Sequence, residues 1–118
     1  MFEVEDIREW LGHDVVDRAR RKIGTLESIY VDTGTDQPLF GTVTVGVPTR
    51  RRLVFVPLVG STVGPGYLKV DHDRKIVKDS PSIDVDGELL AGAEEAVFAH
   101  YDLPYENRAG EERRLARR

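Results

Sequence analysis

The residues able to do acid–base chemistry are few and scattered along the chain. There are three histidines, His13, His72 and His100, and no cysteine. No two histidines stand four residues apart, the spacing that puts two metal ligands on one helix face. His13 precedes Asp14, a pair in which a carboxylate could orient a general base, but a histidine that enters a strand and bonds the backbone explains the pair more simply. No Gly-x-Ser-x-Gly elbow supports serine hydrolysis, so we predict that the chain is not an enzyme.

Two loops share features with ligand-binding motifs without completing them. In residues 82–87, aligning Gly87 with the invariant glycine of a calcium loop puts Ser82 at position one and Ala93 at position twelve. A bidentate Glu is needed at that last position. Residues 60–66 lack the Gly-Lys-Ser/Thr of a phosphate loop, and no helix is expected after them. We expect a turn and a flexible connection, with no metal and no cofactor bound.

Basic residues gather in two short stretches between strand-like segments. They are Arg18, Arg20, Arg21 and Lys22 in the first stretch, and Arg50, Arg51 and Arg52 in the second. If the strands run up and down, successive turns alternate between the two ends of the domain. The two basic turns then share one end, and the turn with Asp32 and Asp36 lies at the other. Such a positive surface would suit an acidic protein segment, RNA or phospholipid head groups, although exposed turns are also charged simply for solubility.

A single tryptophan, Trp10, is the remaining candidate for contact with a partner. Buried aromatic side chains contribute strongly to interfaces. More often such a residue caps the core of its own domain, and we favour that interpretation.

Period-two alternation predicts a mainly β domain. We expect strands over residues 15–16, 23–31, 39–47, 53–59 and 67–70, with the fourth apolar on both faces and therefore covered on each side. In residues 23–31, Ile23, Ile29 and Val31 should share one face and Leu26 and Tyr30 the other. Gly24 is expected at a bulge or a close approach. Helical periodicity is limited to residues 5–11, 73–78 and 91–101.

Composition restricts the class of protein further. The chain has 118 residues and a net charge of −4, and no apolar stretch approaches the ~20 residues that a spanning helix needs. Residues 1–6 lack the pattern of a secretory signal, and the absence of cysteine fits a reducing cytoplasm. The overall charge disfavours a uniformly basic nucleic-acid binder. Residues 1–103 should form one domain, and residues 104–118, with five Arg and three Glu, a disordered charged tail.

An ordered set of short segments resembles the PRC-barrel domain family. They are Gly12-His13-Asp14-Val15-Val16-Asp17, Lys22-Ile23-Gly24-Thr25-Leu26-Glu27, Tyr30-Val31-Asp32 and Arg52-Leu53-Val54-Phe55-Val56-Pro57-Leu58. The later Val77-Lys78-Asp79-Ser80-Pro81 and the stretch from Glu94 to Tyr101 are similar to the tail of stand-alone bacterial members, so the likeness extends over about residues 8–101. Two departures stand out: the first hairpin turn is basic instead of acidic, and the final helix lacks its usual Ser/Thr cap and proline.

The resemblance implies a small, mostly antiparallel β-barrel with short terminal helices. The family includes the cytoplasmic domain of the photosynthetic reaction-centre H subunit and the C-terminal half of a ribosome maturation factor, and archaeal stand-alone members are linked to cell division. Docking to other macromolecules is their common property. We therefore expect a non-catalytic, homodimeric adaptor that binds another protein. The alternative is an RNA- or ribosome-associated factor that docks through its Arg-rich end. Because nothing here resembles the maturation factor's N-terminal domain, its ribosomal role is not carried over.

Overall fold

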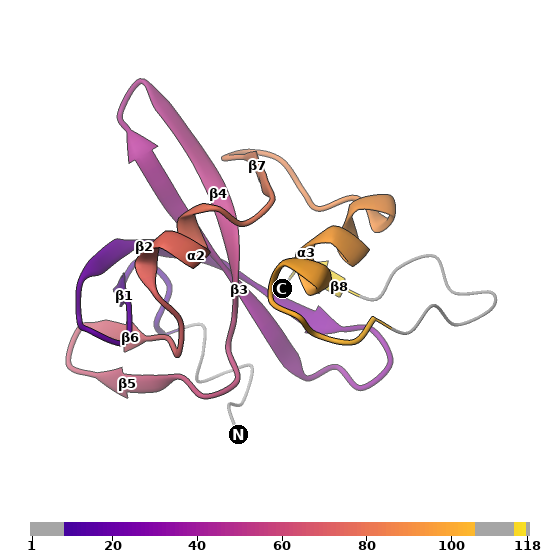
Figure 1. Cartoon of the computed structure of the whole chain (residues 1–118), viewed down its shortest axis with the longest axis horizontal. Coiled ribbons are helices and arrows are strands. Elements are labelled where there is room, and N and C mark those ends of the chain that lie inside the picture. The colour runs from indigo at the N-terminus through magenta and orange to yellow at the C-terminus, as the bar shows by residue number, and fades with distance from the viewer. Residues whose placement is uncertain (1–8, 106–114, 118) are drawn as a thin grey trace.

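The chain folds mainly into β-structure, as the sequence predicts (Figure 1). The computed structural model describes residues 9–105 and 115–117. Its strands are β1 (Asp14–Val16), β2 (Lys22–Asp32), β3 (Pro38–Val47), β4 (Arg50–Pro57), β5 (Thr62–Gly64), β6 (Tyr67–Lys69), β7 (Ser82–Asp84) and β8 (Leu115–Arg117). The helices are α2 (Arg74–Lys78) and α3 (Glu94–His100), the latter preceded by a 3₁₀ turn, η1 (Ala91–Ala93).

One sheet connects all of these strands in the order β5-β6-β1-β2-β3-β4-β7, with β8 paired to β2. Strands β2, β3 and β4 form the expected antiparallel meander. The arrangement is mostly antiparallel, as expected, with one parallel pair, β6 beside β1. The chain reaches β6 through a hairpin with β5, which turns β6 into the direction of β1. In the described part of the chain the hydrogen-bonded ladder ends at β5 and β7 and does not close.

Strand β2 changes face part-way along its length. Its pairing with β3 shifts register between Leu26 and Ser28. An extra residue at a bulge moves every later side chain to the opposite face. Leu26 therefore joins Ile29 and Val31 in the same buried cluster, and a second register shift, at Ile23 in the pairing with β1, brings Ile23 to it as well. The predicted placement of Leu26 on the face opposite these three residues is wrong.

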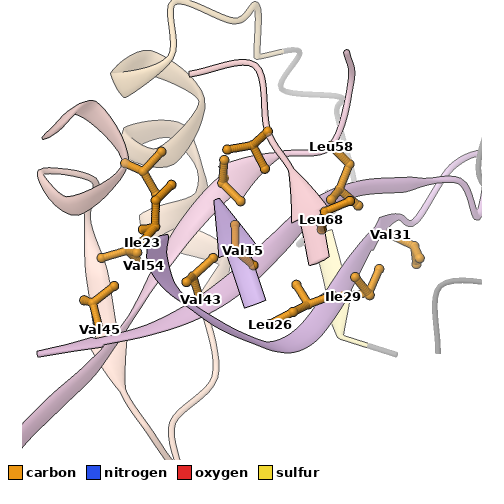
Figure 2. Packing of buried hydrophobic residues seen from close by; sticks show 13 residues of the cluster. Val15, Ile23, Leu26, Ile29, Val31, Val43, Val45, Val54, Leu58 and Leu68 are labelled. Atoms are coloured by element: carbon orange, nitrogen blue, oxygen red, sulfur yellow. The ribbon is translucent and has the colours of Figure 1, made fainter. Parts of the chain in front are cut away.

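Two hydrophobic clusters lie on opposite faces of the central strands. The first is mainly aliphatic and fills the space between β1, β2, β3, β4 and β6, with Val77 of α2 added to it (Figure 2). The second is largely aromatic and brings Tyr30, Phe40 and Phe55 against Phe98 and Tyr101 at the C-terminal helix. Burial on both faces explains why β4 is apolar at successive positions, as the sequence indicates.

Helices α2 and α3 lie within the segments predicted to be helical. Helix α3 places Val97 and Phe98 over the aromatic cluster. At its C-terminal end, the Tyr101 hydroxyl donates a hydrogen bond to the carbonyl of Phe55. The predicted N-terminal helix over residues 5–11 lies largely outside the described residues, and residues 9–12 form turns. Neither described helix combines the length and apolar character required to cross a bilayer.

Two segments expected to lack regular structure contain strands. The glycine-rich segment over residues 60–66 contains β5, which pairs with β6 through Val63 and Leu68. The charged tail expected from residue 104 contains β8, whose Leu115 is fully buried. Glu94, also fully buried, accepts hydrogen bonds from the Leu115 backbone N–H at 2.9 Å and from the Tyr105 hydroxyl at 3.0 Å. Within the segment expected to be a tail, specific buried partners therefore hold Tyr105 and β8.

Candidate functional site

The two basic turns lie at the same end of the sheet. Thr25 of β2 pairs with Thr44 of β3, which in turn pairs with Leu53 of β4. The start of β2, the end of β3 and the start of β4 are therefore adjacent. Lys22 and Arg51 line one hollow of about 680 Å³ at this end. We call the seven basic residues of the two turns the basic end: Arg18, Arg20, Arg21, Lys22, Arg50, Arg51 and Arg52.

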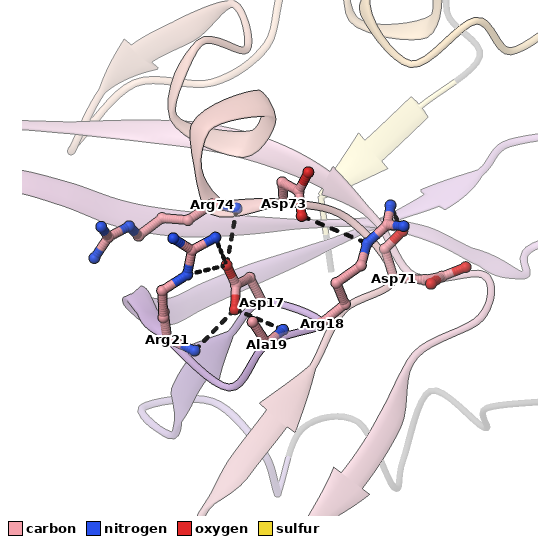
Figure 3. Close-up of polar contacts among 7 residues, drawn as sticks. All are labelled: Asp17, Arg18, Ala19, Arg21, Asp71, Asp73 and Arg74. Carbon is pink, nitrogen blue, oxygen red and sulfur yellow. Dashed lines mark hydrogen bonds and ion pairs between the residues drawn. The ribbon is translucent and has the colours of Figure 1, made fainter.

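A buried carboxylate, Asp17, organises the first basic turn (Figure 3). Its Oδ1 accepts hydrogen bonds from the backbone N–H groups of Ala19 at 2.9 Å and Arg21 at 2.8 Å. Its Oδ2 accepts the Arg21 Nε–H at 3.0 Å and lies 2.9 Å from Arg21 Nη2. The same oxygen accepts the backbone N–H of Arg74 at 3.2 Å, which attaches the turn to the first residue of α2. The local contacts make residues 17–21 an Asx-type turn.

These contacts also decide the charge state of Asp17. Burial acts to raise the pKa of its carboxyl group. The backbone N–H groups of Arg21, Arg74 and Ala19, together with the Arg21 guanidinium, outweigh burial and lower the pKa below its usual value. Asp17 therefore stays ionised at neutral pH and holds the turn as a carboxylate.

The remaining side chains of the first turn do not all point in one direction. Arg18 extends toward Asp73, with Nε 3.7 Å from the carboxylate, and donates to the carbonyl of Asp71. The Arg20 guanidinium lies 6.0 Å from the centre of the Tyr67 ring. Lys22 Nζ lies 3.2 Å from Asp14. The basic turn is thus partly balanced by the protein's own carboxylates.

Two of these ion pairs are too exposed to hold their cations firmly. The side chains of Arg18 and Asp73 are 54% and 52% exposed, and those of Lys22 and Asp14 are 60% and 50% exposed. Exposed pairs of this kind stabilise a protein by about 0–1 kcal/mol. An anionic partner could displace either carboxylate at little cost.

The second basic turn is more open. Arg50 and Arg51 are exposed at the start of β4, and Gly46, with a φ of +102°, shapes the turn beside them. A Cβ at Gly46 would lie 2.2 Å from the carbonyl oxygen of Arg50, so glycine is required there. Arg52 instead turns toward α2 and donates from Nη2 to the carbonyl of Lys78 at 3.1 Å.

Helix α2 adds cations that the sequence analysis missed. Arg74, Lys75 and Lys78 line a hollow of about 380 Å³ together with Arg21 and Asp79. Lys78 also lines the hollow of Lys22 and Arg51. The signal was present as two basic residues four positions apart, Arg74 and Lys78, in a segment recognised as helical. What the sequence could not indicate is that this helix packs beside the first basic turn.

The PRC-barrel domain family model matches residues 2–77. The chain belongs to this family. The match includes the strands from β1 to β6 and ends within α2, so α3 lies beyond it, although the resemblance seen in the sequence extended to residue 101. No curated protein matches the chain. Membership in the family indicates a general protein-interaction module.

Trp10 of this PRC-barrel domain is half-buried and packs against the aliphatic cluster. This contact fits a residue that caps its own core. His13 is not paired with Asp14, whose carboxylate faces Lys22. The backbone N–H and carbonyl of His13 bond Trp10 and Leu26, while its buried Nδ1 has no hydrogen-bond partner among the described residues. In the same residues, no three His, Cys, Asp or Glu side chains group as metal ligands do.

A larger and mainly apolar hollow lies at the opposite end of the domain. It has a volume of about 810 Å³ and is lined by residues that include Leu39, Phe40, Leu58, Phe98 and Leu103. Asp32, from the turn that the sequence placed away from the basic residues, lies on its wall. The two ends therefore differ in chemistry, one basic and one apolar.

Proposed function

We propose that this PRC-barrel domain is a non-catalytic protein-interaction module whose contact surface is the basic end. The observation that carries the proposal is that Lys22 and Arg51, one from each basic turn, line the same hollow. Arg50 and Arg51 are exposed, and neither forms an ion pair with a carboxylate among the described residues. Clustered cations raise the association rate and select anionic partners. The absence of cysteine supports a place in the cytoplasm.

The proposal is tested by replacing two exposed arginines and measuring whether the protein still captures its partner. Tagged wild type is compared with the Arg50→Gln, Arg51→Gln double variant in pull-downs from the native host, read by quantitative mass spectrometry. The control is Thr35→Glu with Ala96→Glu, which makes the same change in net charge at exposed positions in the turn between β2 and β3 and on α3. A partner that the arginine variant loses and the control keeps supports the basic end as the contact surface. Equal capture by all three proteins would contradict it.

We also propose that the domain forms a homodimer. The support is the open sheet, whose described ends, β5 and β7, are three-residue strands with an unpaired edge. Such edges are commonly covered by pairing with a second copy. Val63 on β5 is 43% exposed, so this edge also presents an apolar side chain to the solvent. Light scattering at micromolar concentration checks the dimer, and a mass of 13.3 kDa would contradict it.

RNA association is the second candidate function, favoured by the same cluster of arginines. The phosphate backbone attracts cationic surfaces with a strong dependence on salt. The net charge of −4 argues against it, and Tyr67 is the only aromatic ring recorded near a basic-end guanidinium among the described residues. Salt-sensitive binding that disappears in Arg20→Glu with Arg51→Glu would favour RNA over a protein partner.

A further inference from the structure

We infer that α2 is a binding site for an acidic segment of a partner protein, seated in the hollow of Arg21, Arg74, Lys75, Lys78 and Asp79. The inference rests on the proposed protein-interaction function and adds to it a second basic surface and the chemistry of the partner. Four cations and one carboxylate line this hollow. The Arg21 guanidinium already faces Asp17, so Arg74, Lys75 and Lys78 supply the positive charge that remains.

Of the three cations of α2, Arg74 opposes the helix's own electrostatic preference, whereas Lys75 and Lys78 lie in the last turn, where cations are favoured. Arg74 occupies the first helical position, and the first turn contains no acidic residue. A cation at this end opposes the helix dipole. Arg74 and Lys78 are four positions apart, where like charges repel along one face. The described residues show no ion pair to Arg74, Lys75 or Lys78. A bound anion would relieve the repulsion, whereas the fold itself does not.

The backbone of this five-residue helix is held in place by groups from other elements. Asp17 accepts the N–H of Arg74 at 3.2 Å. Arg52 binds the carbonyl of Lys78 at 3.1 Å, and the Nε2 of His100 lies 2.7 Å from the carbonyl oxygen of Ile76. Val77 is fully buried in the aliphatic cluster. A segment this short would not be stable alone, so these contacts keep its cationic side chains on one rigid base. Figure 3 shows the Arg21 and Arg74 side chains extending to the same side of Asp17, away from Arg18.

The size and position of the hollow favour a peptide with neighbouring carboxylates. A volume of about 380 Å³ accommodates a few side chains and no large ligand. Lys78 also lines the hollow of Lys22 and Arg51, so the two basic surfaces are continuous. An extended acidic segment could follow this path, with successive carboxylates facing α2 and then the start of β4. Aromatic rings for stacking bases are missing from the residues that line either hollow.

Binding of a labelled ten-residue oligoglutamate tests the inference, measured by fluorescence anisotropy at low salt. The site variant is Arg74→Gln with Lys78→Gln, which keeps the backbone N–H that Asp17 requires. The comparison variants are Arg50→Gln with Arg51→Gln, and Thr35→Glu with Ala96→Glu. All three change the net charge by the same amount. Thermal melts confirm that each variant is folded before binding is compared.

We expect the site variant to raise the Kd by about tenfold, the effect of losing two surface charge contacts, while the Thr35/Ala96 control stays within about twofold of wild type. A site variant that behaves like this control overturns the inference, whatever the Arg50/Arg51 variant does. Weakening by the Arg50/Arg51 variant alone would keep the proposed contact surface and remove α2 from it. Failure of wild type to bind the peptide would also overturn the α2 site. The proposed function would then still be tested separately, by the pull-down with the Arg50/Arg51 variant. Wild type could instead bind a ten-nucleotide oligouridine more tightly than the peptide. If the site variant loses that oligouridine binding, the assignment to an acidic protein segment is overturned in favour of RNA.

Discussion

The carboxylate of Asp17 accepts a hydrogen bond from the backbone N–H of Arg74, although the two residues are 57 positions apart. Through this contact one buried group fixes both the first basic turn and the start of α2. The Arg21 side chain is oriented by the same carboxylate. The cations of the turn and those of the helix consequently keep a fixed relation to each other, which a flexible surface could not provide.

Replacing Asp17 by Asn should destabilise the fold by about 2–3 kcal/mol, the range expected for hydrogen bonds to a buried charged group. The amide keeps the shape of the side chain, but its NH₂ group would face the N–H donors of Arg21 and Arg74. Urea unfolding followed by circular dichroism measures the change. Asp14→Asn, which removes only an exposed partner of Lys22, is the matched control and should cost less than about 1 kcal/mol. Equal losses in both variants would contradict the role given to Asp17.

Acid should remove the stabilisation that Asp17 supplies. Its pKa in the folded state lies below the ordinary value of 3.8. For a carboxyl group shifted downward, the contribution is complete above the unfolded pKa and is lost as the pH falls through the folded pKa. The difference in unfolding free energy between wild type and Asp17→Asn should therefore be constant from pH 7 to about pH 5 and shrink below about pH 4. A difference that stays constant down to pH 2 would show that the charge is not responsible.

His72 should make the protein less stable as the pH falls through the neutral range. Burial lowers its pKa below 6.5; the carboxylates of Asp71 and Asp73 oppose this shift, and Arg18 adds to it. The unfolded chain then binds a proton at a higher pH than the folded chain, so stability decreases below about pH 6.5. Proton NMR titration of the imidazole reads this pKa directly. A value at or above 6.5 would be evidence against the partly buried, neutral state, and His72→Gln should reduce the loss of stability between pH 7 and 5.

Gly24 allows β2 and β3 to approach closely, as the sequence suggested. A Cβ at this position would lie 2.0 Å from the carbonyl oxygen of Thr44 and 2.8 Å from a methyl group of Val43. Gly24→Ala should cost about 1–3 kcal/mol, because backbone cannot yield as a flexible side chain does. Gly92→Ala is the control, since nothing lies within 4 Å of a Cβ built there. If both substitutions leave the urea midpoint unchanged, the close approach does not limit stability.

The parts of this fold that were predicted correctly depend on local pattern. Alternation in β3 and the apolar run of β4 indicate which side chains are buried, and two hydrophobic clusters receive them. The convergence of Lys22 and Arg51 follows from the antiparallel order of β2, β3 and β4. It could be predicted because consecutive antiparallel strands put alternate turns together, whatever the tertiary details.

What was missed depends on contacts between distant residues. The bulge after Leu26 exchanges the faces to which the later side chains of β2 point, and no residue type in the sequence indicates a bulge there. The carboxylate of Asp17 meets Arg74 only after the sheet has formed, so the cations of α2 were not assigned to the basic surface. In each case the deciding contact has a long separation in sequence, which periodicity cannot detect.

Strand β8 provides the last prediction, because it lies in the segment that the sequence indicated as a disordered charged tail. Leu115 is fully buried in the aromatic cluster, and its backbone N–H is bound by the buried Glu94. Deleting residues 115–118 would expose that cluster and leave Glu94 without one of its donors. We expect a loss of about 2–5 kcal/mol, comparable to truncating a buried leucine. Leu115→Ala should reproduce most of the loss, whereas Arg117→Ala, an exposed control on the same strand, should not. A deletion as stable as wild type in urea would mean that β8 does not hold the aromatic cluster together.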